Sequence, residues 1–189
     1  MNLPNRLTLI RIALVPFFVL FLLVQQIPLH YLWALLIFIA ASLTDFFDGR
    51  YARKYHMVTD FGKFADPLAD KILVISAFCC FVDMDIMGCV PLIIILFREF
   101  AVTSVRLVSA TKGKVVSANI FGKAKTVSQI VAIIAIILNL VVVQLFGNVL
   151  PKFIFDGINT VMIWVSVMFT VISGIVYLKD NADVYKMMK

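Results

Sequence analysis

A series of long apolar runs, separated by short polar connections, constrains this chain more than any other feature. A helix needs roughly 20 residues to cross a bilayer, and six runs of about that length fill most of the 189 residues. The chain is 62% apolar and 15% charged, which is too few charges to cover a soluble globule of this composition. The runs lie at residues 7–24, 31–47, 64–82, 90–107, 126–146 and 153–178. We therefore predict an all-α, polytopic membrane protein with six transmembrane helices, forming a single domain over residues 1–189.

The distribution of lysine and arginine predicts the orientation of these spans, because basic residues are concentrated on the cytoplasmic side of membrane proteins. Both termini and the connections after the second and fourth spans are basic, through Arg6, Arg11, Arg50, Arg53, Lys54, Lys63, Arg106, Lys112, Lys114, Lys123, Lys125, Lys179, Lys186 and Lys189. The stretches 25–30 and 83–88 contain no lysine or arginine, and 147–152 contains one lysine. Six spans with both termini in the cytoplasm satisfy every connection.

Four aspartates form the most unusual pattern in the chain. Asp45 and Asp48 lie three residues apart at the end of the second run, and Asp66 and Asp70 lie four apart at the start of the third. Both spacings place two side chains on one face of a helix. The hairpin between the two runs is expected to bring the faces together at one membrane depth. Four carboxylates at a membrane edge repel one another and are costly to desolvate, so they need compensating charge.

Hard divalent cations such as Mg²⁺ or Mn²⁺ supply such compensation, because they prefer oxygen ligands. Two cations about 3.5–4 Å apart would match four carboxylates in two pairs and would bind a diphosphate. The alternative is a solvated acidic edge, or salt bridges to nearby cations (Arg50, Arg53, Lys63 and Lys71). Small residues beside the aspartates, Gly49, Ala52 and Gly62, leave room for phosphates to approach the backbone.

The complete pattern resembles a known family. Residues 45–53 read Asp-Phe-Phe-Asp-Gly-Arg-Tyr-Ala-Arg, and residues 62–70 read Gly-Lys-Phe-Ala-Asp-Pro-Leu-Ala-Asp after an eight-residue spacer. This sequence is similar to the D-x-x-D-G-x-x-A-R, spacer, G-x-x-x-D-x-x-x-D motif of the CDP-alcohol phosphotransferases at every fixed position. Residues 2–11, 98–100 and 122–126 further resemble the bacterial branch that makes phosphatidylglycerol phosphate.

The resemblance implies six transmembrane helices around a cytoplasm-facing polar cavity, a homodimer in the bacterial cytoplasmic membrane, and dependence on two divalent cations, Mg²⁺ or Mn²⁺. It implies transfer of a phosphatidyl group from CDP-diacylglycerol to sn-glycerol 3-phosphate, with release of CMP; no nucleic-acid partner is expected. Asp45, Asp48 and Asp66 would carry most of the metal coordination. Asp70 would be partly a metal ligand and mainly the catalytic base on the acceptor hydroxyl, although spacing alone does not decide which carboxylate takes the proton.

The resemblance also implies binding residues for the two substrates. Gly49, Ala52, Arg53 and Gly62 would line the cytidylyl pocket. Asn5, Thr8 and Arg11 share a face at the start of the first span and are assigned to donor binding or to bracing the metal ligands, with ordinary interfacial anchoring as the alternative. The acceptor is a small dianion, for which we predict a cationic site formed by Arg106, Lys125, Lys123 and Arg98. A structural pair between Glu99 and Arg106, seven residues apart on one helix, is the alternative for that region.

Two other functions remain open at this point. The same chemistry could use another alcohol: inositol phosphate, serine or phosphatidylglycerol. An ion-coupled transporter would also place acids within the membrane, but such sites usually lie near the midplane between repeated halves. Here the acids lie at one edge and no repeat is visible, so the enzyme is favoured.

Overall fold

The computed structural model describes residues 3–54, 60–111, 120–147 and 151–180, and these are helical apart from short turns. Within these ranges, the side chains of residues 3–6, 45–54, 60–67, 70, 108, 110 and 111 are not described. The six helices are α1 (Leu3–Leu23), α2 (His30–Lys54), α3 (Asp60–Asp83), α4 (Cys89–Thr111), α5 (Ile120–Phe146) and α6 (Lys152–Asp180). The predicted all-α fold is confirmed, because the described residues contain no strand.

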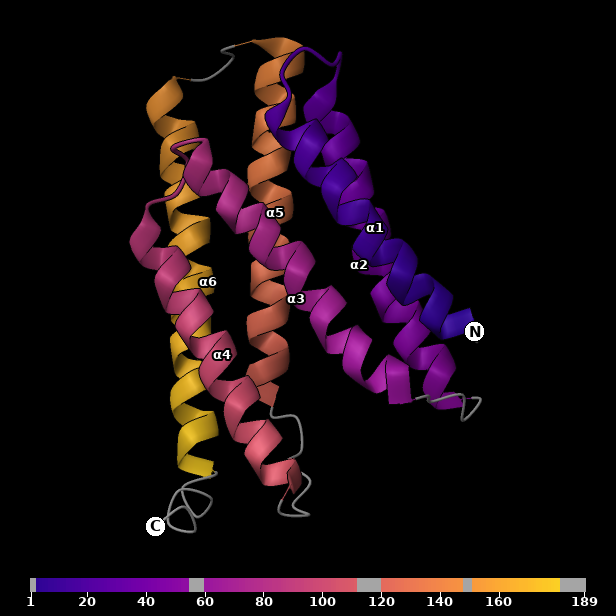
Figure 1. Cartoon of the computed structure of the whole chain (residues 1–189). Coiled ribbons are helices and arrows are strands. Elements are labelled where there is room, and N and C mark those ends of the chain that lie inside the picture. The colour runs from indigo at the N-terminus through magenta and orange to yellow at the C-terminus, as the bar shows by residue number, and fades with distance from the viewer. Residues whose placement is uncertain (1–2, 55–59, 112–119, 148–150, 181–189) are drawn as a thin grey trace.

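The helices form two groups that meet at α5 (Figure 1). In the first group, α1 packs against α2 and α3; in the second, α6 packs against α4 and α5. Contacts between α2 and α5 join the two groups. The core between them is aromatic and aliphatic: the rings of Phe18 and Phe38 lie 5.6 Å apart, and Ile133, Ile136 and Ile137 of α5 are fully buried. Helices suit this composition because they satisfy the backbone hydrogen bonds internally, whatever surrounds the apolar side chains.

All six apolar runs fall in helices, but most of the helices extend beyond the runs at their charged ends. The helix α2 continues to Lys54 and α3 begins at Asp60, so both halves of the aspartate motif are helical. Hydropathy underestimates these lengths because it responds to side chains, whereas the backbone hydrogen-bond ladder continues through polar residues.

Large apolar side chains are exposed along the outer faces of the helices. On α4 they recur at helical spacing, with Val90, Ile93, Phe97, Phe100 and Leu107 each more than half exposed. By length and composition α5 and α6 are able to cross a bilayer, and α1 and α2 contain shorter apolar stretches, Leu7–Leu23 and His30–Thr44. Such outward apolar faces are typical of a protein surrounded by lipid, which supports the prediction of a membrane protein.

Candidate active site

Both halves of the aspartate motif lie at the same end of the molecule. Figure 1 shows the last turns of α2 and the first turns of α3 close together at the lower right, beside the grey connection between them. The backbones of Asp45 and Asp48 belong to α2, and those of Asp66 and Asp70 belong to α3. The end of α4 and the start of α5 also lie at the bottom of this view. The predicted meeting of two acidic helix ends is therefore matched by the course of the backbone.

The metal prediction rests on the chemistry of this donor set. The side chains of the four aspartates, and residues Gly49, Ala52, Arg53 and Gly62, lie outside the residues whose side chains are described. Carboxylate oxygens are the ligands that Mg²⁺ and Mn²⁺ prefer, so the residue types fit a divalent site. Among the side chains that are described, no three His, Cys, Asp or Glu residues lie close enough to hold a metal ion. The aspartate motif is thus the candidate metal site of the chain.

Two of the three predicted donor-binding residues on α1 are fully buried. Thr8 has no exposed surface and Arg11 is 1% exposed, whereas the side chain of Asn5 is not described. An arginine that only anchored the helix at the headgroups would extend toward water. Burial of Thr8 and Arg11 therefore favours a role inside the protein over interfacial anchoring.

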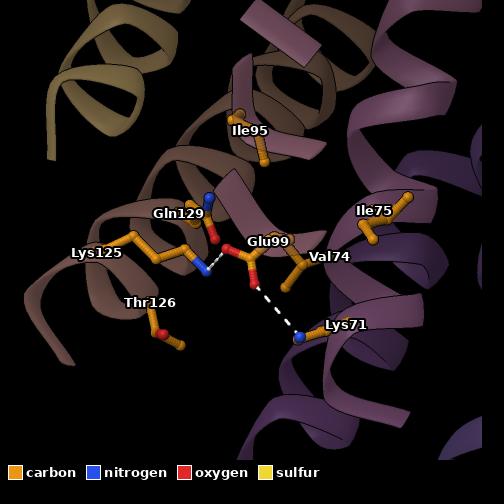
Figure 2. A pocket seen from close by; sticks show the side chains of 8 residues that line it. All are labelled: Lys71, Val74, Ile75, Ile95, Glu99, Lys125, Thr126 and Gln129. Atoms are coloured by element: carbon orange, nitrogen blue, oxygen red, sulfur yellow. Dashed lines mark ion pairs between the residues drawn. The ribbon is translucent and has the colours of Figure 1, made fainter. Parts of the chain in front are cut away.

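A buried carboxylate on α4 gathers cations from three helices. Glu99, the only glutamate in the sequence, is 6% exposed. Its Oε1 lies 2.5 Å from the Nζ of Lys125 on α5, and its Oε2 lies 3.9 Å from the Nζ of Lys71 on α3 (Figure 2). The same Oε1 lies 3.2 Å from the Nη1 of Arg98. Ionic groups this deeply buried are stable only when they are paired. We call Lys71, Arg98, Glu99 and Lys125 the Glu99 cluster.

Neutral groups accept further hydrogen bonds from the Glu99 cluster. Lys71 donates to the hydroxyl of Thr103 on α4, and the Nη2 of Arg98 donates to the Oγ of Ser173 on α6 at 2.5 Å. The Nε of Arg98 is buried without a hydrogen-bond partner among the described residues. The cluster thus connects α3, α4, α5 and α6 and leaves one buried donor unused.

A small cavity of about 10 Å³ adjoins the cluster, enough for roughly one water molecule. Lys71, Glu99 and Lys125 line it together with Val74, Ile75, Ile95, Thr126 and Gln129, as Figure 2 shows. The amide of Gln129 donates to the hydroxyl of Thr170 on α6 at 3.2 Å. The side chain of Lys71 is 30% exposed, whereas those of Glu99 and Lys125 are 8% exposed.

The structure divides the four predicted acceptor residues into two pairs. Arg98 and Lys125 meet at Glu99, whereas Arg106 and Lys123 are exposed and lie outside the cluster. The alternative pair between Glu99 and Arg106 is wrong, because the cations at Glu99 are Lys125, Arg98 and Lys71. Spacing along one helix suggested Arg106, but Lys71 and Lys125 come from other helices. The one feature of the sequence that points to Lys71 as a site residue is its position directly after Asp70.

Comparison with known proteins supports the reading of the motif. The chain matches the family described as CDP-alcohol phosphatidyltransferase over residues 1–172. A Bacillus subtilis protein named CDP-diacylglycerol–glycerol-3-phosphate 3-phosphatidyltransferase is 43% identical, across 98% of this chain and 97% of its own length. A Rickettsia typhi protein of the same name is 37% identical, across 94% of this chain and 96% of its own. These matches confirm the resemblance that the aspartate motif indicated.

Proposed function

Because this chain belongs to the CDP-alcohol phosphatidyltransferase family, we propose that it transfers the phosphatidyl group of CDP-diacylglycerol to sn-glycerol 3-phosphate. The products are phosphatidylglycerol phosphate and CMP. The observation that carries the proposal is the 36–43% identity, over nearly the whole chain, to proteins named for this reaction. The complete aspartate motif and the position of its two halves at one end of the fold support the same reaction. Family membership favours this enzyme over an ion-coupled transporter.

In the proposed topology, all six helices span the bacterial cytoplasmic membrane, and both termini and the motif face the cytoplasm. The basic connections support this orientation. Figure 1 supports it as well, because the α2–α3 and α4–α5 ends lie at the bottom of the view and the α1–α2 and α5–α6 ends lie at the top. This places the motif near the headgroups, where the diphosphate of a lipid donor lies while its acyl chains remain in the bilayer. Two copies of the chain form a homodimer in this proposal, and membrane lipids surround it.

In the proposed site, Asp45, Asp48 and Asp66, with a contribution from Asp70, would hold two divalent cations, Mg²⁺ or Mn²⁺. When bound, such cations neutralise the diphosphate and polarise the phosphorus under attack. Asp70 acts mainly as the general base and accepts the proton of an acceptor hydroxyl. The hydroxyl oxygen forms a bond to the phosphorus of the phosphatidyl group, and the bond to CMP breaks, with CMP keeping the electron pair.

The donor and acceptor are bound by different residues in this proposal. Gly49, Ala52, Arg53 and Gly62 line the cytidylyl pocket, and Asn5, Thr8 and Arg11 bind the donor or brace the metal ligands. The buried positions of Thr8 and Arg11 support the inward-facing role. Arg106, Lys123, Lys125 and Arg98 provide positive charge for the acceptor phosphate. Arg106 and Lys123 are exposed, whereas Lys125 and Arg98 lie against Glu99.

An assay with purified protein tests the proposed reaction. The protein is given CDP-diacylglycerol and Mg²⁺ or Mn²⁺, with glycerol 3-phosphate, inositol phosphate, serine or phosphatidylglycerol in separate reactions. We expect CMP and phosphatidylglycerol phosphate only with glycerol 3-phosphate, and no CMP when EDTA removes the metal. CMP release with another alcohol, and none with glycerol 3-phosphate, would assign the same chemistry to a different acceptor.

A further inference from the structure

A cavity of about 690 Å³ lies at the end of the molecule opposite to the aspartate motif. Its walls come from the ends of α1, α3 and α5 and from the starts of α2 and α6, so it lies between the two helix groups (Figure 1). Ligand sites in proteins are typically cavities of roughly 300–1,000 Å³. We propose that this cavity binds one membrane lipid whose headgroup carries both a primary ammonium and a phosphate. The proposal goes beyond the proposed reaction and does not depend on it.

The charges around the cavity are the first argument. Three aspartates and one lysine line it: Asp83, Asp85, Asp156 and Lys152. All four are exposed, and none forms an ion pair with another residue of the described part of the chain. Their sum is two negative charges, which attracts a cationic group and repels a headgroup that is only anionic. A primary ammonium suits the carboxylates further, because it has three hydrogen-bond donors.

The placement of the carboxylates is the second argument, because it suits an organic cation better than a metal ion. Asp83 ends α3 and Asp85 lies in the turn that follows, whereas Asp156 belongs to α6. No three such acids lie close enough to hold one metal ion among the side chains described. Asp85 has a φ of 56°, a conformation that aspartate tolerates, and the N–H of Ile86 donates to the carbonyl of Phe81 at 2.9 Å. The turn therefore presents its carboxylate at a defined place.

The start of α6 is the third argument, because it offers a place for the phosphate. Lys152 is the first residue of this helix. The first N–H groups of a helix have no acceptor within the helix, and they favour an anion together with the helix dipole. Lys152 and Asp156 are four residues apart and share one face of α6, so a cation and an anion face the same cavity. A zwitterionic headgroup complements this arrangement.

The floor of the cavity is the fourth argument, and it favours a lipid over a free headgroup. Leu22, Phe155 and Asn159 are buried and line the cavity, so it extends from the charged residues into an apolar interior. Asn159 is 6% exposed, and its Oδ1 accepts from Asn139. Its Nδ2 donates to no other group of the described residues. Buried donors require acceptors, and an ester carbonyl of a lipid provides one while its chains contact Leu22 and Phe155.

Competitive lipid binding tests the proposal. The purified protein in detergent is incubated with equal amounts of phosphatidylethanolamine, phosphatidylcholine and phosphatidylglycerol that carry the same acyl chains. Native mass spectrometry then measures which lipid each chain retains. We expect one phosphatidylethanolamine per chain, retained about tenfold more than either other lipid, as for one charged hydrogen bond. Equal retention of all three lipids would overturn the proposal, since the outer apolar faces alone would then hold them.

A variant that lacks the three carboxylates locates the binding. Asp83→Asn, Asp85→Asn and Asp156→Asn are combined, and the protein should fold because all three side chains are exposed. Retention of phosphatidylethanolamine should fall about tenfold or more. The matched control is Asp180→Asn, which removes an exposed acid at the other end of α6 and should leave retention unchanged. Unchanged retention in the triple variant, or an equal loss in the control, would overturn the proposal.

A final arm separates a lipid from its free headgroup. Soluble phosphoethanolamine in about tenfold excess should not displace the lipid, because it lacks the chains that contact the floor. Displacement would overturn the assignment to a lipid. These mixtures contain no CDP-diacylglycerol and no glycerol 3-phosphate. Failure of this inference and failure of the proposed reaction are therefore distinguished.

Discussion

Two of the polar contacts that join the described helices differ in kind. Near the start of α5, Lys125 joins the Glu99 cluster, which brings together four charged groups from three helices, two of them buried and two partly exposed. Toward the opposite end, Asn139 on α5 donates to the Oδ1 of Asn159 on α6 at 2.8 Å, so the contact is neutral. The fourteen residues from Lys125 to Asn139 correspond to roughly 21 Å along α5. The comparison shows that α5 takes part in one charged and one neutral contact with its neighbours.

The surroundings of the two contacts differ as well. The amide pair borders a cavity of about 690 Å³, whose lining includes Asp83, Asp85 and Asp156, whereas the Glu99 cluster borders a space of about 10 Å³. Polar groups beside the large cavity can be solvated, which lowers the cost of placing them there. The Glu99 cluster has little room for water, so its charged groups depend on one another and on neighbouring polar side chains for compensation.

The largest effect is expected at the motif itself. Asp66→Asn and Asp70→Asn should each reduce CMP release from CDP-diacylglycerol by roughly 100-fold or more, because each removes a metal ligand or the base. The measurement is CMP formation by purified variants, with circular dichroism showing that each retains the helical content of the unmodified protein. Full activity in both variants would contradict the proposed site.

A smaller and selective effect is expected when basic residues of the proposed acceptor site are substituted. Lys125→Ala and Arg106→Ala should raise the KM for glycerol 3-phosphate about tenfold, because each removes a charge from the proposed phosphate site. The KM for CDP-diacylglycerol should change far less. Steady-state kinetics with each substrate varied in turn measures both values. A rise confined to the donor KM would move these residues to the donor site.

At the contact between Asn139 and Asn159, a substitution should change the free energy of unfolding but neither KM value. Asn159→Ala leaves the amide of Asn139 without its partner and should lower the free energy of unfolding by about 1 kcal/mol. Thermal unfolding in detergent measures the loss. Both KM values should remain within about twofold of the unmodified protein. An effect on acceptor KM as large as that of Lys125→Ala would remove the distinction between the two contacts.

The smallest effects come from two glycines on α6. A Cβ at Gly157 would meet nothing within 4 Å, whereas a Cβ at Gly174 would meet Arg98 at 3.1 Å. Gly157→Ala should therefore stabilise the protein by about 0.5–1 kcal/mol, through the higher helix propensity of alanine. In Gly174→Ala the displacement of Arg98 should cancel that gain. Equal stabilisation of both variants would mean that Arg98 moves freely against α6.

Much of the fold followed from the sequence, because apolar length and basic connections are local properties. All six runs fall in helices, and the motif halves fall at one end. The partners of Glu99 could not be derived in this way. Spacing within one helix suggested Arg106, but Lys71 and Lys125 reach Glu99 only through the packing of α3 and α5 against α4. Lys125 and Arg98, which the prediction grouped, both contact Glu99.

The step of one residue from Asp70 to Lys71 has a mechanical consequence. Consecutive residues on an α-helix project about 100° apart, so these two positions belong to different faces of α3. Any rotation of α3 about its own axis moves both faces by the same angle. A movement of Lys71 that turns α3 would therefore also turn Asp70, with no loop or second helix between the two.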